Sequence, residues 1–302
     1  MIGSPLLDGR DRYERVMDGW VDNTHDTAFT HTVRLTDPDR SVEVTAVCTP
    51  SPDYEVREAS VRVLSGTVDP GIAADFPGLA GARMVGGFTK RLAELCGPRQ
   101  GRELLVQAGI EMARLSRQVT KMPASTVASL QPGDSQACWA LDMAGWVDLP
   151  DSCFTYSSAG RALFGTRPVS SPMVPALYSP PPGARGVFTR RKVARLVLTG
   201  RRLHLFHSMH DNVHGFDVHF EIDLDRGTIV AADSITSRLP YAGICTEPQS
   251  RIEALRGQAV DAALRKRTQG LLGGIGGCAQ LYDLTSDLLK LLGLDSTQIA
   301  EK

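Results

Sequence analysis

Hydrophobic and polar residues alternate along residues 29–35 and again along residues 216–224. A period of two sends successive side chains to opposite faces of a strand, so both segments are predicted to be half-buried strands. Residues 42–48 are expected to pair with the first segment as a hairpin, because residues 37–40 between them are turn-forming. The second half is predicted to add strands at residues 187–198, 202–207 and 228–235.

Helical periodicity follows the predicted strands of the first half. Apolar residues recur at three- and four-residue spacing along residues 84–95, where Gly97-Pro98 ends the run, and along residues 104–115, which predict a second, longer helix up to Met122-Pro123. In the second half, the glycine-rich residues 270–277 lead into an apolar segment that is predicted to be helical as far as Leu292. These patterns predict an α+β fold in which antiparallel sheets pack against helices.

The middle of the chain differs in composition from the segments on either side of it. Residues 167–183 contain six prolines, which disfavour both helix and sheet and are typical of a semi-rigid linker or a surface arm. A chain of 302 residues, 42% of them hydrophobic, is also longer than one average domain. We therefore expect a first α+β lobe at residues 10–123, a connecting helical and proline-rich segment at 124–185 and a second α+β lobe at 186–295.

Two short motifs occur in both halves at nearly the same interval. Residues 61–66 resemble residues 252–257, and Gly86-Gly87-Phe88 resembles Gly276-Gly277-Cys278, with offsets of 191 and 190 positions. Aligning Phe29 with Phe216 also keeps the apolar faces of the two alternating strands in phase, as a repeat requires. The sequence thus predicts two related lobes that arose by internal duplication, with a ligand held where they meet.

Charge and composition limit the classes of partner. The formal net charge of −1 gives no surplus of basic residues for neutralising a phosphate backbone, so no nucleic-acid partner is expected. Residues 1–11 lack the apolar run of a signal peptide, and no apolar stretch reaches membrane-spanning length, which predicts a cytoplasmic location without a membrane partner. The six cysteines have no paired spacing and are expected to be reduced.

Several motifs of the second half occur together. Residues 238–245 (RLPYAGIC), 255–257 (LRG) and 273–278 (GGIGGC) follow two predicted strands and a histidine-containing turn. In this combination the second half resembles a bacterial domain of unknown function, family 2889, with the first half as a diverged copy. That family often continues its Gly-Cys with Thr-His-Leu, where this chain has residues 279–281 (AQL). The resemblance implies an α+β fold and supplies no activity.

Five of the seven histidines lie between His204 and His219. His204 and His207 are three residues apart on a predicted strand, so they are expected to point to opposite faces and not to share a metal. His210 and His214, with Asp211, lie in the predicted turn, where they would converge either as acid–base groups or as metal ligands. The alternative is a polar strand end with solvated imidazoles.

Other candidate groups combine a titratable side chain with a charged neighbour. His25 precedes Asp26, and a histidine beside a carboxylate suits proton transfer near neutral pH. Tyr54 follows two prolines that would present its phenol rigidly, and Tyr241 occupies the related region of the second lobe. Turn formation by Asp26 and a charged, exposed loop around Tyr54 are the structural alternatives.

Glu111 and Arg114 lie three residues apart on the second predicted helix, where Arg114 would clamp a carboxylate or carbonyl substrate. A solvated face with an internal ion pair is the alternative. Cys245 would serve as a nucleophile only with a lowered pKa, and burial is the usual fate of such a cysteine. The sequence has no Walker motif, dinucleotide fingerprint or nucleophile elbow.

Together these features predict a cofactor-independent enzyme that acts on a small aromatic or carbonyl compound, as a lyase, isomerase or hydrolase. The predicted acid–base residues are His25, Tyr54, His210 and His214, and the predicted substrate-binding residues are Arg114, Glu111 and Tyr241. One alternative is a non-catalytic ligand-binding or assembly protein that forms homo-oligomers through an apolar surface along residues 270–292. A metalloenzyme that uses His210 and His214 is the other.

Overall fold

The strands of the chain form one continuous antiparallel sheet. A computed structural model describes residue 7, residues 9–131 and residues 133–294, so position 295 of the predicted second lobe lies outside the described residues. The eight strands are hydrogen-bonded in the order β4-β3-β2-β1-β5-β6-β7-β8. Their bounds are Arg12–Asp22 (β1), Phe29–Thr36 (β2), Ser41–Cys48 (β3), Val56–Ser65 (β4), Phe188–Thr199 (β5), Arg202–Asp211 (β6), Gly215–Asp223 (β7) and Thr228–Arg238 (β8).

Helices follow each set of four strands and also fill the segment between the sets. The α-helices are Pro70–Asp75 (α1), Phe88–Cys96 (α2), Arg102–Leu115 (α3), Ala124–Val127 (α4), Ser135–Gly145 (α5), Ser158–Ala162 (α6), Pro175–Tyr178 (α7), Leu264–Leu272 (α8) and Ala279–Lys290 (α9). The 3-10 helices are Phe76–Leu79 (η2), Phe154–Tyr156 (η3), Leu163–Gly165 (η4) and Glu247–Leu255 (η5). Within the described residues, no helix has the length and apolar character needed to cross a membrane.

The sequence correctly predicted the hairpin of the first half. Strands β2 and β3 pair antiparallel, with Phe29 opposite Cys48 and Thr36 opposite Ser41. The turn between them is closed by Asp37, whose side chain accepts hydrogen bonds from the backbone N–H groups of Asp39 and Arg40 at 3.0 and 2.8 Å. An aspartate that bonds its own following backbone stabilises such a turn, as the sequence indicated.

The prediction of two separate sheets is wrong, and the α+β class is confirmed. The period-two pattern identifies a strand and its buried face, but it does not specify which strand lies on each side. Strand β1 was also not predicted. Its buried face contains Gly19 between Met17 and Val21, and a Cβ at Gly19 would lie 2.7 Å from Leu115 Cδ1. This position has to stay small for α3 to approach, which interrupts the hydrophobic pattern.

The two motif pairs that suggested a duplication do not occupy equivalent elements. Residues 61–65 belong to strand β4, whereas residues 252–255 belong to the 3-10 helix η5. Gly87 caps α2, which α3 follows on the sheet, whereas Gly277 precedes α9, which itself follows α8. Nothing supports a diverged copy of the second-half domain in the first half. Glycines recur at such positions because turns and helix starts require them.

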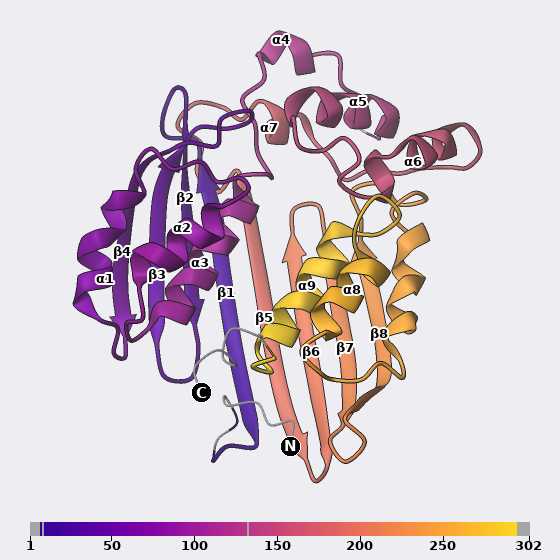
Figure 1. Cartoon of the computed structure of the whole chain (residues 1–302). Helices are drawn as coiled ribbons and strands as arrows, with labels where there is room; N and C mark the ends of the chain where they lie inside the picture. The colour runs from indigo at the N-terminus through magenta and orange to yellow at the C-terminus, as the bar shows by residue number, and fades with distance from the viewer. Residues whose placement is uncertain (1–6, 8, 132, 295–302) are drawn as a thin grey trace. The chain divides into compact units, whose positions relative to one another are not determined.

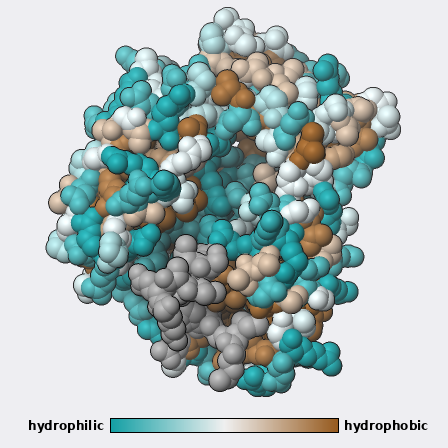
Figure 2. Space-filling view, viewed as in Figure 1, coloured by the Kyte–Doolittle hydropathy of each residue, from teal (hydrophilic) through white to brown (hydrophobic). Residues whose placement is uncertain are grey.

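The chain divides into two compact units. One comprises residues 15–147 and 173–191, and the other comprises residues 1–14, 148–172 and 192–302. In the first unit α3 packs on β2 and β3, and in the second α9 packs on β6 and β7 (Figure 1). On the molecular face in Figure 2, hydrophilic residues are interspersed with smaller hydrophobic areas. Within each unit, these helices cover the face of the strands that carries the alternating apolar residues.

A buried histidine lies in the core of the first unit. His31 is 1% exposed on the helix-covered face of β2, and neither of its ring nitrogens has a hydrogen-bond partner of good geometry. Its ring lies edge-on to Phe29, with the ring centroids 6.2 Å apart. Desolvation lowers the pKa of His31 from 6.5 to about 4, and the nearby backbone of Phe29 offsets only part of this effect. The imidazole is therefore neutral in the folded protein.

We expect His31 to make folding sensitive to acid. As the pH falls from 6.5 through about 4, the unfolded chain gains a proton that the folded protein excludes. The free energy of unfolding should consequently decrease, by up to about 3 kcal/mol below the folded-state pKa. Urea denaturation across this pH interval would show a smaller decrease for His31→Leu than for the wild type. The exposed His25 is the control, since His25→Leu should keep the wild-type pH dependence, and an unchanged dependence in His31→Leu would contradict the assignment.

Candidate functional site

Two histidine–carboxylate pairs lie in the hairpin between β6 and β7. The first is buried in the turn, where His214 Nδ1 lies 3.1 Å from both carboxylate oxygens of Asp211. The Oδ1 atom of Asp211 also accepts hydrogen bonds from the backbone N–H groups of Val213 (2.7 Å) and His214 (2.6 Å). Since these bonds fix the turn, the Asp211–His214 pair has a clear structural role.

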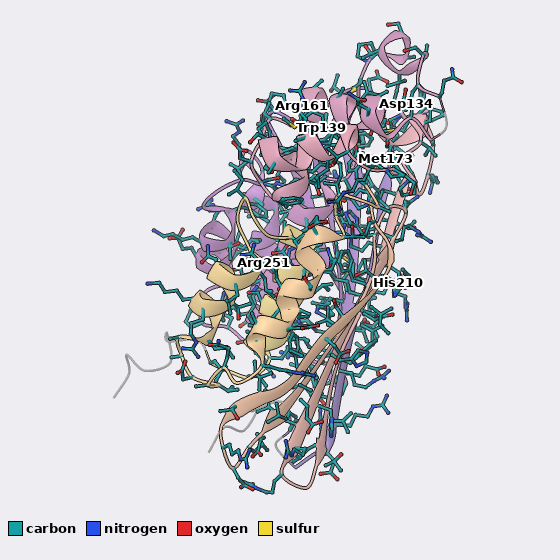
Figure 3. The ribbon with its side chains drawn as sticks, turned by 90° about the vertical axis from the view of Figure 1, so that its right-hand side faces the viewer. Asp134, Trp139, Arg161, Met173, His210 and Arg251 are labelled. Carbon is teal, nitrogen blue, oxygen red and sulfur yellow. The ribbon has the colours of Figure 1, made fainter. Side chains whose placement is uncertain are left out.

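The second pair is more exposed and faces the other way. His210 Nε2 lies 3.2 Å from Asp217 Oδ1, and the histidine side chain is 49% exposed. In Figure 3 His210 lies on the opposite side of the strands from Arg251 and the helices. The hairpin thus contains both predicted histidines, His210 in β6 and His214 in the turn, but each lies beside its own carboxylate. No group of three or more His, Cys, Asp or Glu side chains in the described chain has metal-binding geometry.

A groove of about 380 Å³ lies on strands β5–β8 of the second unit. One row of side chains crosses it from strand to strand: Arg195, Phe206, His219 and Asp233. The Cζ atom of Arg195 lies 5.5 Å from the centroid of the Phe206 ring, and the rings of Phe206 and His219 are 4.9 Å apart. His219 is directly opposite Asp233 in the β7–β8 register. A cation, two neighbouring rings tilted by 51° to each other and a carboxylate therefore follow one another across the sheet.

A second row of side chains, next to the first, lines the rest of the groove. Val197, His204, Glu221 and Ala231 line it, and His204 is directly opposite Glu221 in the β6–β7 register. The Nδ1 atom of His204 lies 3.8 Å from Glu221 Oε2, and Arg202 holds the other oxygen of Glu221 at 3.1 Å. Because Val197 and Ala231 are small, space remains above the strands. The groove presents two imidazoles, each opposite a carboxylate, beside an aromatic ring and a guanidinium.

The period-two pattern of the strands predicts which of these groove residues share a face of the sheet. His204 and Phe206 are two residues apart on β6, and His219 and Glu221 are two apart on β7, so each pair shares a face. His204 and His207 point to opposite faces, as predicted: His204 is exposed, and His207 is 3% exposed. The sequence did not reveal which residue of β7 lies opposite which residue of β6, and that register creates the groove.

The remaining acid–base candidates lie in the first unit, near the C-terminal end of α3. Tyr54 is fully buried with its ring beneath Arg117, whose Cζ atom is 5.1 Å from the ring centroid. His25 is exposed, and its backbone carbonyl accepts a hydrogen bond of 2.8 Å from Lys121 Nζ. Arg117 and Lys121, which follow α3, thus contact the ring of Tyr54 and the backbone carbonyl of His25. The sequence predicted that the two prolines hold the Tyr54 phenol rigidly, and the structure places the ring in the buried core of this unit.

Glu111 and Arg114 form a partly buried ion pair on α3. Arg114 Nη1 lies 2.5 Å from Glu111 Oε1, and the Glu111 side chain is 2% exposed. Gln107, one helical turn earlier, donates its amide to the same oxygen at 3.2 Å. This face of α3 packs towards the sheet and is not the solvated stripe that the sequence also allowed. In this structure the guanidinium of Arg114 is bound to its own helix.

Tyr241 and Cys245 contribute to packing in the second unit. Tyr241 is fully buried, and the rings of Tyr156 and Phe164 pack edge-on against it at 6.3 and 6.2 Å. The Sγ atom of Cys245 lies 2.9 Å from the Thr155 hydroxyl oxygen. Burial raises the pKa of the Cys245 thiol above its usual range, so the thiol remains protonated. These contacts join the connecting segment to the loop after β8.

A buried ion pair beneath α9 was not predicted. Lys192 Nζ on β5 lies 3.5 Å from Asp287 Oδ2 on α9, and the two side chains are 4% and 1% exposed. Lys290 binds the other oxygen of Asp287 at 3.1 Å. Nearby, His207 Nδ1 lies 2.9 Å from the backbone carbonyl oxygen of Leu284. The sequence of β5 shows only an alternation of residue types. That pattern does not reveal that Lys192 lies on the buried face, because its partner Asp287 is far away in the chain.

The part of the chain that holds the groove and these helices matches a known protein family. Residues 198–292 form a domain of the family described as protein of unknown function, DUF2889. The match confirms the resemblance predicted for the second half. The DUF2889 domain includes β6, β7, β8, η5, α8 and α9, and all the groove residues except Arg195 and Val197. No curated protein and no solved structure matches the chain.

The two aspartates of the β6–β7 hairpin should differ in their effect on stability. Asp211→Ala would leave buried backbone N–H groups without acceptors, which should lower the free energy of unfolding by about 2–3 kcal/mol. Asp217→Ala removes only the exposed partner of His210 and should cost less than about 1 kcal/mol. Chemical denaturation of the two variants and the wild type would measure both values. Equal losses would contradict the structural role of Asp211.

Proposed function

We propose that the DUF2889 domain of this protein binds a small organic molecule in the groove on β5–β8 and transfers a proton to or from it. The supporting observation is that two imidazoles, His204 and His219, lie in one groove, each opposite a carboxylate and both adjacent to Phe206. Histidine is suited to proton transfer near neutral pH, and a neighbouring carboxylate orients the ring and stabilises its protonated form. The reaction would need no cofactor.

The groove also indicates the type of substrate. A planar or aromatic group would stack on the ring of Phe206 or on that of His219, which lie 4.9 Å apart and are tilted by 51° to each other. An anionic or carbonyl oxygen would be attracted to Arg195, whose Nε atom is held by Glu14 at 2.7 Å so that the guanidinium has a fixed position. These groups favour an aromatic or carbonyl compound as the substrate of a lyase, isomerase or hydrolase. Nucleic acid and membrane partners have no place in the proposal.

We thus assign the proton transfer to other residues than those that the sequence first indicated. His210 lies further along β6 and is bonded to Asp217, and His214 stabilises the turn with Asp211. His25, Tyr54, Arg114 and Glu111 belong to the other compact unit and have no part in the groove. The class of reaction is unchanged, but the groups that perform it are His204 and His219.

Ligand binding without catalysis is the second candidate function. It is favoured by the same row of side chains, because Arg195, Phe206 and His219 would hold a planar anion whether or not a proton moves. The two functions differ in whether the imidazoles exchange protons with the ligand. An assembly role for residues 270–292 has less support, since the leucines of α9 are buried against the strands.

Solvent exchange tests the proposal without knowledge of the natural reaction. Phenylpyruvate, which combines a ring, a carbonyl and a carboxylate, would be incubated with the protein in deuterium oxide. Loss of its C3 proton signal, followed by NMR, should be faster than in buffer alone. His219→Ala and His204→Ala should each slow the protein-dependent exchange by about 100-fold, the usual contribution of one acid–base group. His210→Ala is the matched control and should keep the wild-type rate.

Three outcomes separate the alternatives. Exchange that depends on His204 and His219 supports the enzyme. Binding of phenylpyruvate that weakens in Phe206→Ala, without any exchange above the buffer rate, supports the non-catalytic function. If the probe neither binds nor exchanges, or if all three histidine variants behave alike, the groove is not the site.

A further inference from the structure

Strand β4 is an edge of the sheet with an open hydrogen-bonding side. It is the first strand in the sheet order and, among the strands of the described residues, pairs only with β3. Its first residue, Val56, is covered, because it bonds the backbone of Ala82 and Gly81 at 2.8 Å. No other described segment forms a backbone hydrogen bond with residues 57–65. Unpaired N–H and C=O groups along an edge strand are a template for another strand.

The side chains of this edge are exposed and carry both charges. Glu58, Ser60 and Arg62 alternate along one face of β4, opposite Val47, Thr45 and Glu43 of β3. All three side chains are exposed, and Glu58 has no ion-pair partner in the described part of the chain. The apolar residues Val63 and Leu64 are 37% and 39% exposed at the end of the strand. Residues 57–65 contain no proline, and the irregularities of the β3–β4 pairing lie at the two ends of β4, so residues 58–63 between them keep a regular register.

The charge pattern of β4 is self-complementary in one register. A two-fold axis through Ser60 would place Glu58 opposite Arg62 of the partner subunit, and Arg62 opposite Glu58 of the partner subunit. The Arg62 guanidinium, held by Glu43 at 2.6 Å and 66% exposed, would then lie between two carboxylates. A slip of one residue would instead bring Arg62 opposite Arg57 of the partner subunit, or leave both charges without a partner. Charged pairs of this kind fix the register of strands.

We propose that two copies of this chain associate through antiparallel pairing of their β4 strands, centred on Ser60. The two sheets then continue into each other across the interface. Edge pairing alone buries less surface than a standard interface, so the dimer is a weak one with a dissociation constant on the order of micromolar. Since exposed ion pairs contribute to it, high salt weakens the dimer.

A charge swap tests this interface. Sedimentation equilibrium of the wild type should show a monomer–dimer equilibrium, and Glu58→Arg should raise the dissociation constant at least roughly tenfold, because both ion pairs become repulsive. Arg62→Glu should act in the same direction. The double variant Glu58→Arg/Arg62→Glu restores opposite charges and should recover the wild-type association. Glu253→Arg, an equal charge change on the exposed side of η5, is the control and should leave association unchanged.

Circular dichroism and thermal melts would verify that each variant is folded. A wild type that stays monomeric up to its solubility limit overturns the proposal. It is likewise overturned if the folded Glu58→Arg variant dimerises as tightly as the wild type, or if the folded double variant fails to recover association.

Cysteine cross-linking tests the register independently. Residues opposite each other in antiparallel strands have Cα atoms about 4.5–5.5 Å apart, which is within the range for a disulfide. Ser60→Cys should therefore give a covalent dimer on mild oxidation, beyond any cross-linking of the wild type. Ser65→Cys, on the same strand but away from the axis, should not. Equal cross-linking of both variants contradicts pairing centred on Ser60.

Discussion

Hydrophobic burial on one face of the strands is the constraint on which the rest of this structure depends. In each compact unit, helices cover the face that carries the alternating apolar residues, as α3 does on β2 and β3 and α9 on β6 and β7. The opposite face of β5–β8 holds the polar residues that line the groove. An antiparallel sheet with one apolar and one polar face is stable only when every strand keeps its register. Strand pairing therefore decides both what is buried and what can meet a ligand.

The same constraint explains why similar residues have different roles on the two faces. His207 on the covered face contacts the backbone of α9, whereas His204 on the open face lies beside Glu221 in the groove. Likewise the Lys192–Asp287 pair is enclosed beneath α9, while the Arg34–Glu43–Arg62 group, with two exposed arginines, links neighbouring strands of the first unit. A buried charge requires a partner, but an exposed one retains water and remains available.

The polar face of β5–β8 and the β4 edge are the places at which we propose that this sheet interacts with other molecules. A groove forms where small side chains, Val197 and Ala231, lie between larger ones. The hydrogen-bonding edge of β4 is open beyond Val56, the residue that bonds to the backbone of Gly81 and Ala82. Both features result from the strand order, and neither corresponds to a recognisable sequence motif.

The sequence by itself determined the α+β class, the β2–β3 hairpin with its Asp37 turn, and the resemblance of the second half to the DUF2889 family. These depend on local periodicity, turn chemistry and short motifs, which adjacent residues specify. Only the tertiary structure decided that the strands form one sheet, that Tyr54 and Glu111 are buried, and that His219 lies between Phe206 and Asp233. Those outcomes depend on contacts between residues far apart in the chain, and a period-two pattern specifies the face of a strand without its neighbour.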